Sequence, residues 1–231
     1  MFLAVFGVTL LSRLPFLDAG YGAPDAWRVV RAARAIAGGA YEYSRMPGFP
    51  VHEFTSSLFV GLGPVGLNAL TALFSALAAG FVALLVRGSG RGGALYAGLA
   101  LALVPVFYTQ SAQTLDTPWA VAFMTASLYC ALTERPLAAG VALGLAIGCR
   151  VTSGAAALPA LILLSGSAAP RVFVRRALVF GVTALALGVL CYLPVYAVYG
   201  ADFFRVSSWG GYSPDARRIV AMALDGVWGK L

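Results

Sequence analysis

Charged side chains are scarce in this sequence and gather in one stretch, residues 18–53. This stretch holds four of the nine acidic residues of the chain: Asp18, Asp25, Glu42 and Glu53. It also holds four arginines: Arg28, Arg31, Arg34 and Arg45. A carboxylate can serve as a general base or a metal ligand, and a guanidinium fork fits a phosphate group. Any chemistry is therefore expected to centre on this stretch.

Asp25 directly follows Pro24, and Arg28 lies one helical turn later on the same side. This spacing suits a catalytic carboxylate beside an arginine that binds a phosphate. The structural alternative is an acid in the first turn of a helix, where it complements the helix dipole after an N1 proline. Spacing alone leaves both interpretations open.

Asp116 is the only acidic residue between Glu53 and Glu134, and it lies at the edge of a predicted membrane segment. Ionisable side chains at such a depth are candidates for function. The sequence Asp-Thr-Pro is also typical of an ordinary helix N-cap. Asp116 is therefore a second candidate catalytic residue, with helix capping as the alternative.

His52, the only histidine, is followed by Glu53. With Asp25 or Asp116 the pair could form an oxygen-and-nitrogen site for a divalent ion such as Mg, Mn or Zn. The alternative is an exposed polar pair in a loop. A divalent metal is thus the one cofactor that the sequence suggests.

Arg13 and Arg150 lie at the ends of predicted membrane segments. Snorkelling of long basic side chains toward water is one explanation. Convergence with Arg28 and Arg45 on the phosphate of an anionic lipid is the other.

The composition excludes a soluble globular protein, because 60% of the residues are hydrophobic and 11% are charged, against about 25% charged in soluble domains. In a membrane protein, the net charge of +7 is interpreted through the positions of the arginines relative to the bilayer. No nucleic-acid partner is expected. Cys130, Cys149 and Cys191 lie in apolar segments without CxxC spacing, so neither a disulfide nor a cysteine-ligated zinc is expected.

Apolar stretches predict an all-α, polytopic membrane helix bundle. The expected spans are residues 1–17, 66–86, 93–109, 117–133 and 174–198. Residues 137–166 carry Arg150 in their middle, where a charge would cost about 2.5–3.5 kcal/mol in a single span. A hairpin of two short helices with Arg150 at the bend avoids this cost, which brings the total to seven membrane segments.

Arginine-rich segments 87–92, 134–136 and 167–176 are expected on the cytoplasmic side, with a cytoplasmic N-terminus and a retained first helix. The loop 18–65, residues 109–116, the Arg150 bend and the tail 201–231 are then external, in a bacterial inner membrane. Within the loop, residues 24–37 are predicted to form an amphipathic helix lying on the membrane. Residues 51–62 are too short to span and are expected to dip into the interface or to lie along it.

Three short motifs carry a family resemblance. Residues 24–28 read Pro-Asp-Ala-Trp-Arg, residues 45–50 read Arg-Met-Pro-Gly-Phe-Pro, and residues 144–150 read Gly-Leu-Ala-Ile-Gly-Cys-Arg. They resemble the Pro-Asp-Glu-x-Arg, Arg-x-Pro-Gly-Tyr-Pro and Gly-x-x-x-Gly-x-x-[Lys/Arg] patterns of the GT-C superfamily of polyprenyl-phosphate-dependent glycosyltransferases. The branch is that of protein O-mannosyltransferases and aminoarabinose transferases (glycosyltransferase family 39-like). Ala26 departs from the first pattern, and Asp116 matches a second-loop acid by position.

The resemblance implies that residues 1–200 form a GT-C-like transmembrane module with an external catalytic loop at residues 18–65. It implies an inverting transferase that uses a polyprenyl-phosphate sugar, with Asp25 and Asp116 in the catalytic site and the lipid phosphate on four arginines: Arg13, Arg28, Arg45 and Arg150. The acceptor, a lipid, glycan or protein, is open. The alternatives are a non-catalytic protein that binds or flips polyprenyl lipids, and an inactive truncated relative, since the chain ends where the family's second long external loop is expected.

Overall fold

The computed structural model describes residues 1–166 and 169–200, and these residues form helices without any strand, as predicted. The helices are α1 (Phe2–Arg13), α2 (Pro24–Ala37), α3 (Pro50–Phe59), α4 (Gly63–Leu85), α5 (Gly90–Leu103), α6 (Pro105–Ser111), α7 (Thr117–Leu132), α8 (Pro136–Cys149), α9 (Ala157–Ser165) and α10 (Pro170–Tyr199). The predicted external tail, residues 201–231, lies outside the described residues.

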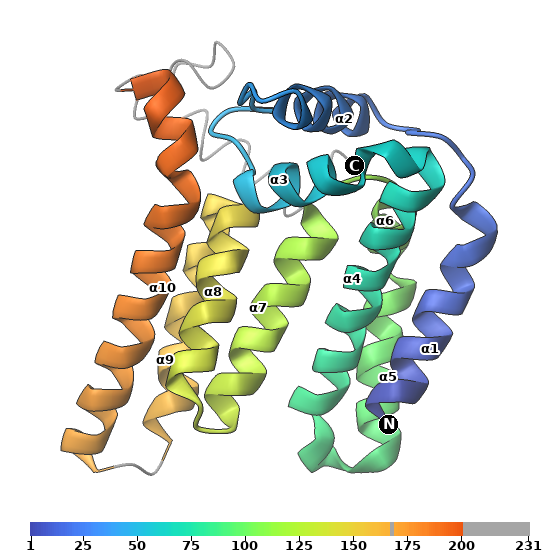
Figure 1. Cartoon of the computed structure of the whole chain (residues 1–231). Coiled ribbons are helices and arrows are strands. Elements are labelled where there is room, and N and C mark those ends of the chain that lie inside the picture. The colour runs from blue at the N-terminus through green and yellow to red at the C-terminus, as the bar shows by residue number, and fades with distance from the viewer. Residues whose placement is uncertain (167–168, 201–231) are drawn as a thin grey trace, which may run out of the picture.

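The long helices pack side by side as a bundle, while α2 and α3 lie across one of its ends (Figure 1). The predicted polytopic bundle is thereby confirmed. By length and composition, two described stretches could each cross a membrane, Pro50–Leu85 and Pro170–Tyr199, and the bent pair of α5 and α6 would be a third. The remaining apolar helices are shorter: Phe2–Phe16, Thr117–Leu132, Pro136–Cys149 and Val151–Ser165.

The predicted span over residues 93–109 is broken in the structure. Helix α5 ends at Leu103 and α6 begins at Pro105, with a bend of 68° between the two. Proline has no N–H to continue the helix and disfavours helical backbone in the residue before it. Val104 accordingly has a ψ of 121°, and the single span becomes two helices.

The predicted hairpin over residues 137–166 is confirmed. Helices α8 and α9 run in opposite directions (Figure 1) and are joined through Arg150 and a 3-10 turn at Val151–Ala156. Arg150 leaves the helix with extended backbone, at φ −155° and ψ 120°. The arginine therefore lies at the end of the bundle, as the cost of a charge in the bilayer centre requires.

All helix ends that carry candidate residues lie at the end of the bundle covered by α2 and α3 (Figure 1). These are the end of α1 at Arg13, the start of α7 after Asp116 and the end of α8 before Arg150. The opposite end holds the ends of α4 and α7 and the start of α10, next to the arginine-rich segments. The candidate site residues and the arginine-rich segments thus lie at opposite ends of the bundle. Which of these ends faces the outside of the cell stays a prediction.

Helix α2 has the predicted bounds, but protein rather than lipid covers its apolar face. Val29, Val30 and Ala33 are at most 1% exposed, and the face packs on α3 and on Leu67 of α4. The reason is that α3 lies between α2 and the bundle (Figure 1). The prediction of a helix resting on the bilayer by this face is corrected accordingly.

Glycines allow α8 to pack closely against α10. A Cβ at Gly140 would lie 2.7 Å from the carbonyl oxygen of Phe180, and one at Gly144 would lie 2.7 Å from Cβ of Leu187. Both distances are too short for real contacts. The Gly-x-x-x-Gly faces of α8 therefore serve packing within the chain.

Candidate functional site

Five charged side chains form one continuous set of ion pairs at the end of the bundle covered by α2 and α3. Arg45 pairs through Nη1 with Oδ2 of Asp25 and through Nη2 with Oδ1 of Asp116, the latter at 2.7 Å. Nη1 of Arg28 lies 3.3 Å from Oδ1 of Asp25, and Nε of Arg150 lies 3.1 Å from Oδ2 of Asp116. We call these five residues the ion-pair network.

The network joins four separate parts of the chain. Asp25 and Arg28 belong to the first turns of α2, and Arg45 to the loop between α2 and α3. Asp116 precedes α7 at its N-cap, and Arg150 follows α8 at its C-cap. Five of the eight predicted site residues are therefore brought together, with three guanidinium groups for two carboxylates.

Burial differs sharply along the network. The side chain of Asp116 is 1% exposed, that of Arg45 is 24% exposed and that of Asp25 is 36% exposed. A buried carboxylate needs compensating charge and hydrogen bonds. Arg45 gives Asp116 both, through a hydrogen bond to Oδ1, whereas Arg150 supplies charge beside Oδ2, which accepts no hydrogen bond from the described residues. Asp25, in contrast, remains accessible to a reactant.

Phe49 and Thr117 complete the surroundings of the arginines, although the sequence did not single them out. Cζ of Arg45 lies 4.8 Å from the centroid of the Phe49 ring, and Cζ of Arg150 lies 5.9 Å from it. Nη1 of Arg150 donates a hydrogen bond to Oγ1 of Thr117 at 2.9 Å. The sequence did contain a signal for Phe49: it is the aromatic residue of the Arg-Met-Pro-Gly-Phe-Pro motif, and guanidinium groups stack on aromatic faces.

The turn that carries Arg45 requires glycine at position 48. Gly48 has a φ of +94°, and a Cβ there would lie 3.0 Å from the Tyr41 hydroxyl. The Tyr192 hydroxyl of α10 donates to the Gly48 carbonyl at 3.2 Å. The turn is thus held against α10.

Glu53 fixes the conformation of the loop between α2 and α3, which contains Arg45. Its carboxylate accepts hydrogen bonds from the Ser44 amide at 2.7 Å, the Ser44 hydroxyl at 2.6 Å and the Tyr41 hydroxyl at 2.8 Å. Burial, followed by the nearby charge of Glu53, raises the pKa of Tyr41, so its hydroxyl stays protonated and donates. Glu53 is fully buried and holds Ser44, the neighbour of Arg45, in place.

His52 is also fully buried, with its ring centroid 5.1 Å from that of Trp119. The alternative of an exposed loop pair at His52 and Glu53 is therefore wrong, because α3 begins at Pro50 and turns both side chains into the protein. Among the described residues, no three His, Cys, Asp or Glu side chains converge to hold a metal ion. The Glu53 oxygens are already engaged in hydrogen bonds, whereas both ring nitrogens of His52 have no hydrogen-bond partner among the described residues. The metal site stays a prediction.

Arg13 takes a different position from the other predicted arginines. It is fully buried, donates to the Ser12 hydroxyl at 2.7 Å and to the Ala102 carbonyl, and lies 4.2 Å from the Tyr108 ring. The break before Pro105 leaves carbonyl groups at the end of α5 without helical donors, and Arg13 satisfies one of them. Its contact with a lipid phosphate stays a prediction.

Comparison with known families gives one match. A family model described as dolichyl-phosphate-mannose-protein mannosyltransferase matches residues 48–197, well over half of the chain. The matched region contains Asp116 and Arg150 and begins after Asp25, Arg28 and Arg45. No curated protein and no solved structure matches the chain.

Proposed function

Because the chain belongs to the dolichyl-phosphate-mannose-protein mannosyltransferase family and is thus a membrane glycosyltransferase of the GT-C type, we propose that its ion-pair network is the active site. The donor is a polyprenyl-phosphate sugar, and the reaction takes place on the external face of the membrane. The observation that carries the proposal is that Arg45 bridges two carboxylates, with Arg28 and Arg150 at either end of the network.

The arginines would bind the donor phosphate. A water-insoluble donor places its head group at the membrane surface, and a phosphate leaving group needs fixed positive charge as its own charge develops. Arg28 and Arg150 are the more exposed guanidinium groups of the network, with 61% and 38% of their side chains exposed. They can therefore reach a ligand while Arg45 stays between the carboxylates.

Asp25 is proposed as the general base, and Asp116 as the residue that holds the arginines in position. Asp25 would take the proton of the acceptor hydroxyl, and the acceptor oxygen would attack the anomeric carbon from the face opposite the phosphate. The bond between that carbon and the phosphate oxygen would break with its electron pair on the oxygen. The product has inverted configuration, and polyprenyl phosphate is released. No step is assigned to a metal.

The test is transfer from a radiolabelled polyprenyl-phosphate sugar by the purified protein in detergent. Asp25→Asn is expected to lower turnover at least about a hundredfold, the usual scale for a lost general base, while lipid binding is retained. Asp18→Asn, an exposed acid of the same loop outside the network, serves as the matched control and should keep turnover.

Equal turnover in the wild type and Asp25→Asn would remove Asp25 from the mechanism. Lipid binding without turnover in any variant would instead favour the non-catalytic lipid-binding alternative. Because a lipid, a glycan or a protein could accept the sugar, the first assay would measure hydrolysis of the donor together with transfer to a mixture of membrane acceptors.

A further inference from the structure

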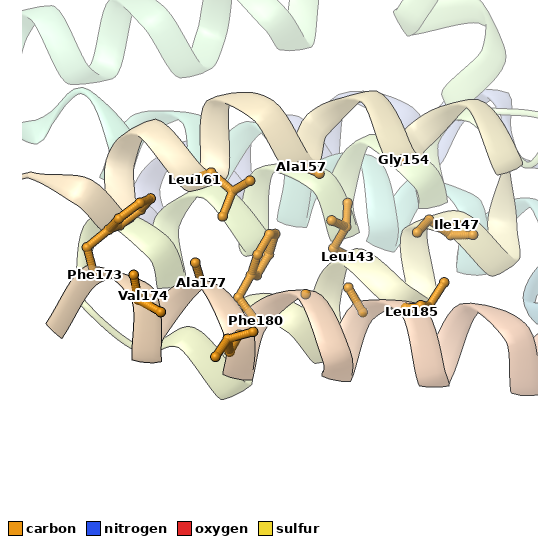
Figure 2. Close-up of a pocket in the computed structure, with 13 residues that line it drawn as sticks. Leu143, Ile147, Gly154, Ala157, Leu161, Phe173, Val174, Ala177, Phe180 and Leu185 are labelled. Atoms are coloured by element: carbon orange, nitrogen blue, oxygen red, sulfur yellow. The ribbon is translucent and has the colours of Figure 1, made fainter. Parts of the chain in front are cut away.

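The cavity between α10 and the α8–α9 hairpin has an apolar wall. Its volume is about 440 Å³, and Figure 2 shows Leu143 of α8, Leu161 of α9 and Phe180 of α10 among its lining residues. None of the described residues that line it is charged. A polar reactant such as the acceptor alcohol must therefore be recognised at another place in the molecule.

A smaller pocket, of about 250 Å³, has a mostly polar wall. Residues of α2, of the loop between α2 and α3 and of the end of α10 line it: Arg28, Arg31, Glu42, Tyr43, Ser44 and Tyr199. We call it the α2 pocket. Sites for drug-sized ligands have volumes of about 300–1,000 Å³, so the α2 pocket suits one small ring. Nη1 of Arg28 lies 3.3 Å from Oδ1 of Asp25, which places the pocket beside the proposed general base.

The ion pair between Arg31 and Glu42 leaves both a donor and an acceptor for a ligand. Arg31 donates to Oε1 of Glu42 through Nε, at 2.7 Å, and through Nη2. Within the described residues, Nη1 of Arg31 and Oε2 of Glu42 have no hydrogen-bond partner. The side chain of Arg31 is 79% exposed, so a ligand in water can reach it. A pair of neighbouring hydroxyl groups both donates and accepts hydrogen bonds and therefore matches this ion pair.

Two tyrosines give the α2 pocket an aromatic wall. The ring centroids of Tyr43 and Tyr199 lie 4.6 Å apart, with an angle of 63° between the ring planes. Tyrosine combines an apolar ring with a polar hydroxyl, so this wall can contact the C–H face of a sugar ring. The Ser44 amide and hydroxyl are bound to the buried Glu53. The loop residue next to Tyr43 is thus fixed before a ligand arrives, which lowers the entropic cost of binding.

We propose that the α2 pocket binds the acceptor, and that the acceptor is a glycan whose terminal sugar ring lies in the pocket. This inference rests on the proposed function, which requires an acceptor hydroxyl at Asp25. Two neighbouring hydroxyls of the ring bind Arg31 and Glu42, and the apolar face of the ring lies against Tyr43 and Tyr199. A further hydroxyl reaches Asp25 past Arg28 and attacks the donor.

The same features select a glycan over the other two acceptor classes. The family description names a protein as the acceptor, but an extended peptide binds along a sheet edge or a groove, and the α2 pocket holds one ring. A lipid acceptor would bring hydrocarbon to a wall that is mostly polar, where burial of apolar surface contributes little.

Binding is tested first, because it does not depend on the reaction. Saturation-transfer NMR on the purified protein in detergent compares the methyl glycosides of glucose, galactose and mannose with a short peptide that contains threonine. At least one glycoside is expected to bind more tightly than the peptide. Arg31→Ala should weaken its binding about tenfold, the scale of one hydrogen bond to a charged group, and Tyr43→Leu should weaken it to a smaller extent.

Two controls match these variants. Arg34→Ala removes an exposed arginine of the same helix outside the pocket, and Tyr96→Leu removes an exposed tyrosine of α5; both should bind the glycoside as the wild type does. Arg31→Lys keeps a positive charge beside Glu42 and lacks the guanidinium fork, so it should also bind more weakly. Wild-type affinity in Arg31→Lys and Arg31→Ala, or no binding of any glycoside by the wild type, would overturn the inference.

A transfer assay separates this inference from the proposed function. With a radiolabelled polyprenyl-phosphate sugar as donor, the glycoside that binds should become labelled and the peptide should not. Label on the peptide or on membrane lipid alone would keep the proposed function and overturn the glycan acceptor. Selective glycoside binding without turnover of the donor would keep the α2 pocket as a sugar site and count against the proposed function.

Discussion

The two aspartates of the ion-pair network share one arginine but differ in their surroundings. Asp116 is buried between Arg45 and Arg150, and Asp25 is accessible beside Arg28. Exposed ion pairs contribute about 0–1 kcal/mol to stability, whereas removal of one partner from a buried pair costs much more because the other charge stays behind. The same substitution should therefore act differently at the two positions.

Asp116→Asn is expected to lower the free energy of unfolding by about 2–4 kcal/mol, below the upper end for buried pairs because both arginine partners are partly exposed. Asp25→Asn should change it by less than about 1 kcal/mol. Denaturant titration in detergent, followed by the near-ultraviolet signal of the tryptophans, measures both. Equal destabilisation by the two variants would contradict the assignment of Asp116 as the structural centre of the network.

At the scale of elements, the loop between α2 and α3 owes its conformation to contacts with α3 and α10. Glu53 of α3 accepts three hydrogen bonds from Tyr41 and Ser44, and Tyr192 of α10 holds Gly48. Arg45 lies between these two attachment points. Its reach to both aspartates therefore depends on residues that do not touch the network themselves.

Glu53→Ala is expected to destabilise the protein by about 3 kcal/mol or more, because hydrogen bonds to a charged group contribute about 1.5–3 kcal/mol each. Tyr41→Phe, which removes one of the three bonds, should cost about 1.5–3 kcal/mol. In transfer assays Glu53→Ala should raise KM more than it lowers kcat, since Arg45 loses its position. Recovery of activity on adding Mg²⁺, Mn²⁺ or Zn²⁺ would count against this role and in favour of a metal ligand.

The close packing of α8 against α10 leads to a second prediction about how the helices are held together. Gly144→Leu should destabilise the protein by about 1–3 kcal/mol, as overpacking of a close contact does, because its side chain would meet Leu187 and the Ala184 carbonyl. Gly181→Ala on α10 is the control and should leave stability unchanged or raise it. Thermal unfolding in detergent compares them, and a stable Gly144→Leu protein would show that α8 and α10 can separate.

For the whole molecule, the bundle has two chemically distinct ends. One carries the ion-pair network under α2 and α3, and the other carries the arginine-rich segments (Figure 1). Helix α10, with 30 residues, is about 45 Å long and exceeds a hydrocarbon core of about 30 Å. Its last residue, Tyr199, contacts the rings of Tyr41 and Tyr43, which links the loop between α2 and α3 to α10.

The predicted orientation can be tested by cysteine labelling in intact cells. In a variant without the three native cysteines, Ala40→Cys should react with a membrane-impermeant maleimide from outside. Ser89→Cys, at the other end of the bundle, should react only after permeabilisation. Both positions are exposed, and the reverse pattern of labelling would refute an external active site.

Sequence alone determined the features that depend on local pattern and composition. The scarcity of charge specified a membrane protein, the apolar periodicity and Pro24 set the bounds of α2, and the cost of a charge in the bilayer predicted the α8–α9 hairpin around Arg150. The candidate residues Asp25, Arg45 and Asp116 were found as well, since charged side chains are few enough for each to be noticed.

Only the tertiary structure decided which of these residues meet. Arg45 and Asp116 are 71 positions apart, and no local pattern specifies their contact. Arg13 resembles Arg150 in the sequence, yet the bend at Pro105 draws it to the α5 carbonyl, while Glu53 becomes the support of a loop. The physical reason is that a long side chain binds whichever partner the packed helices place within reach, and helix packing depends on the whole chain.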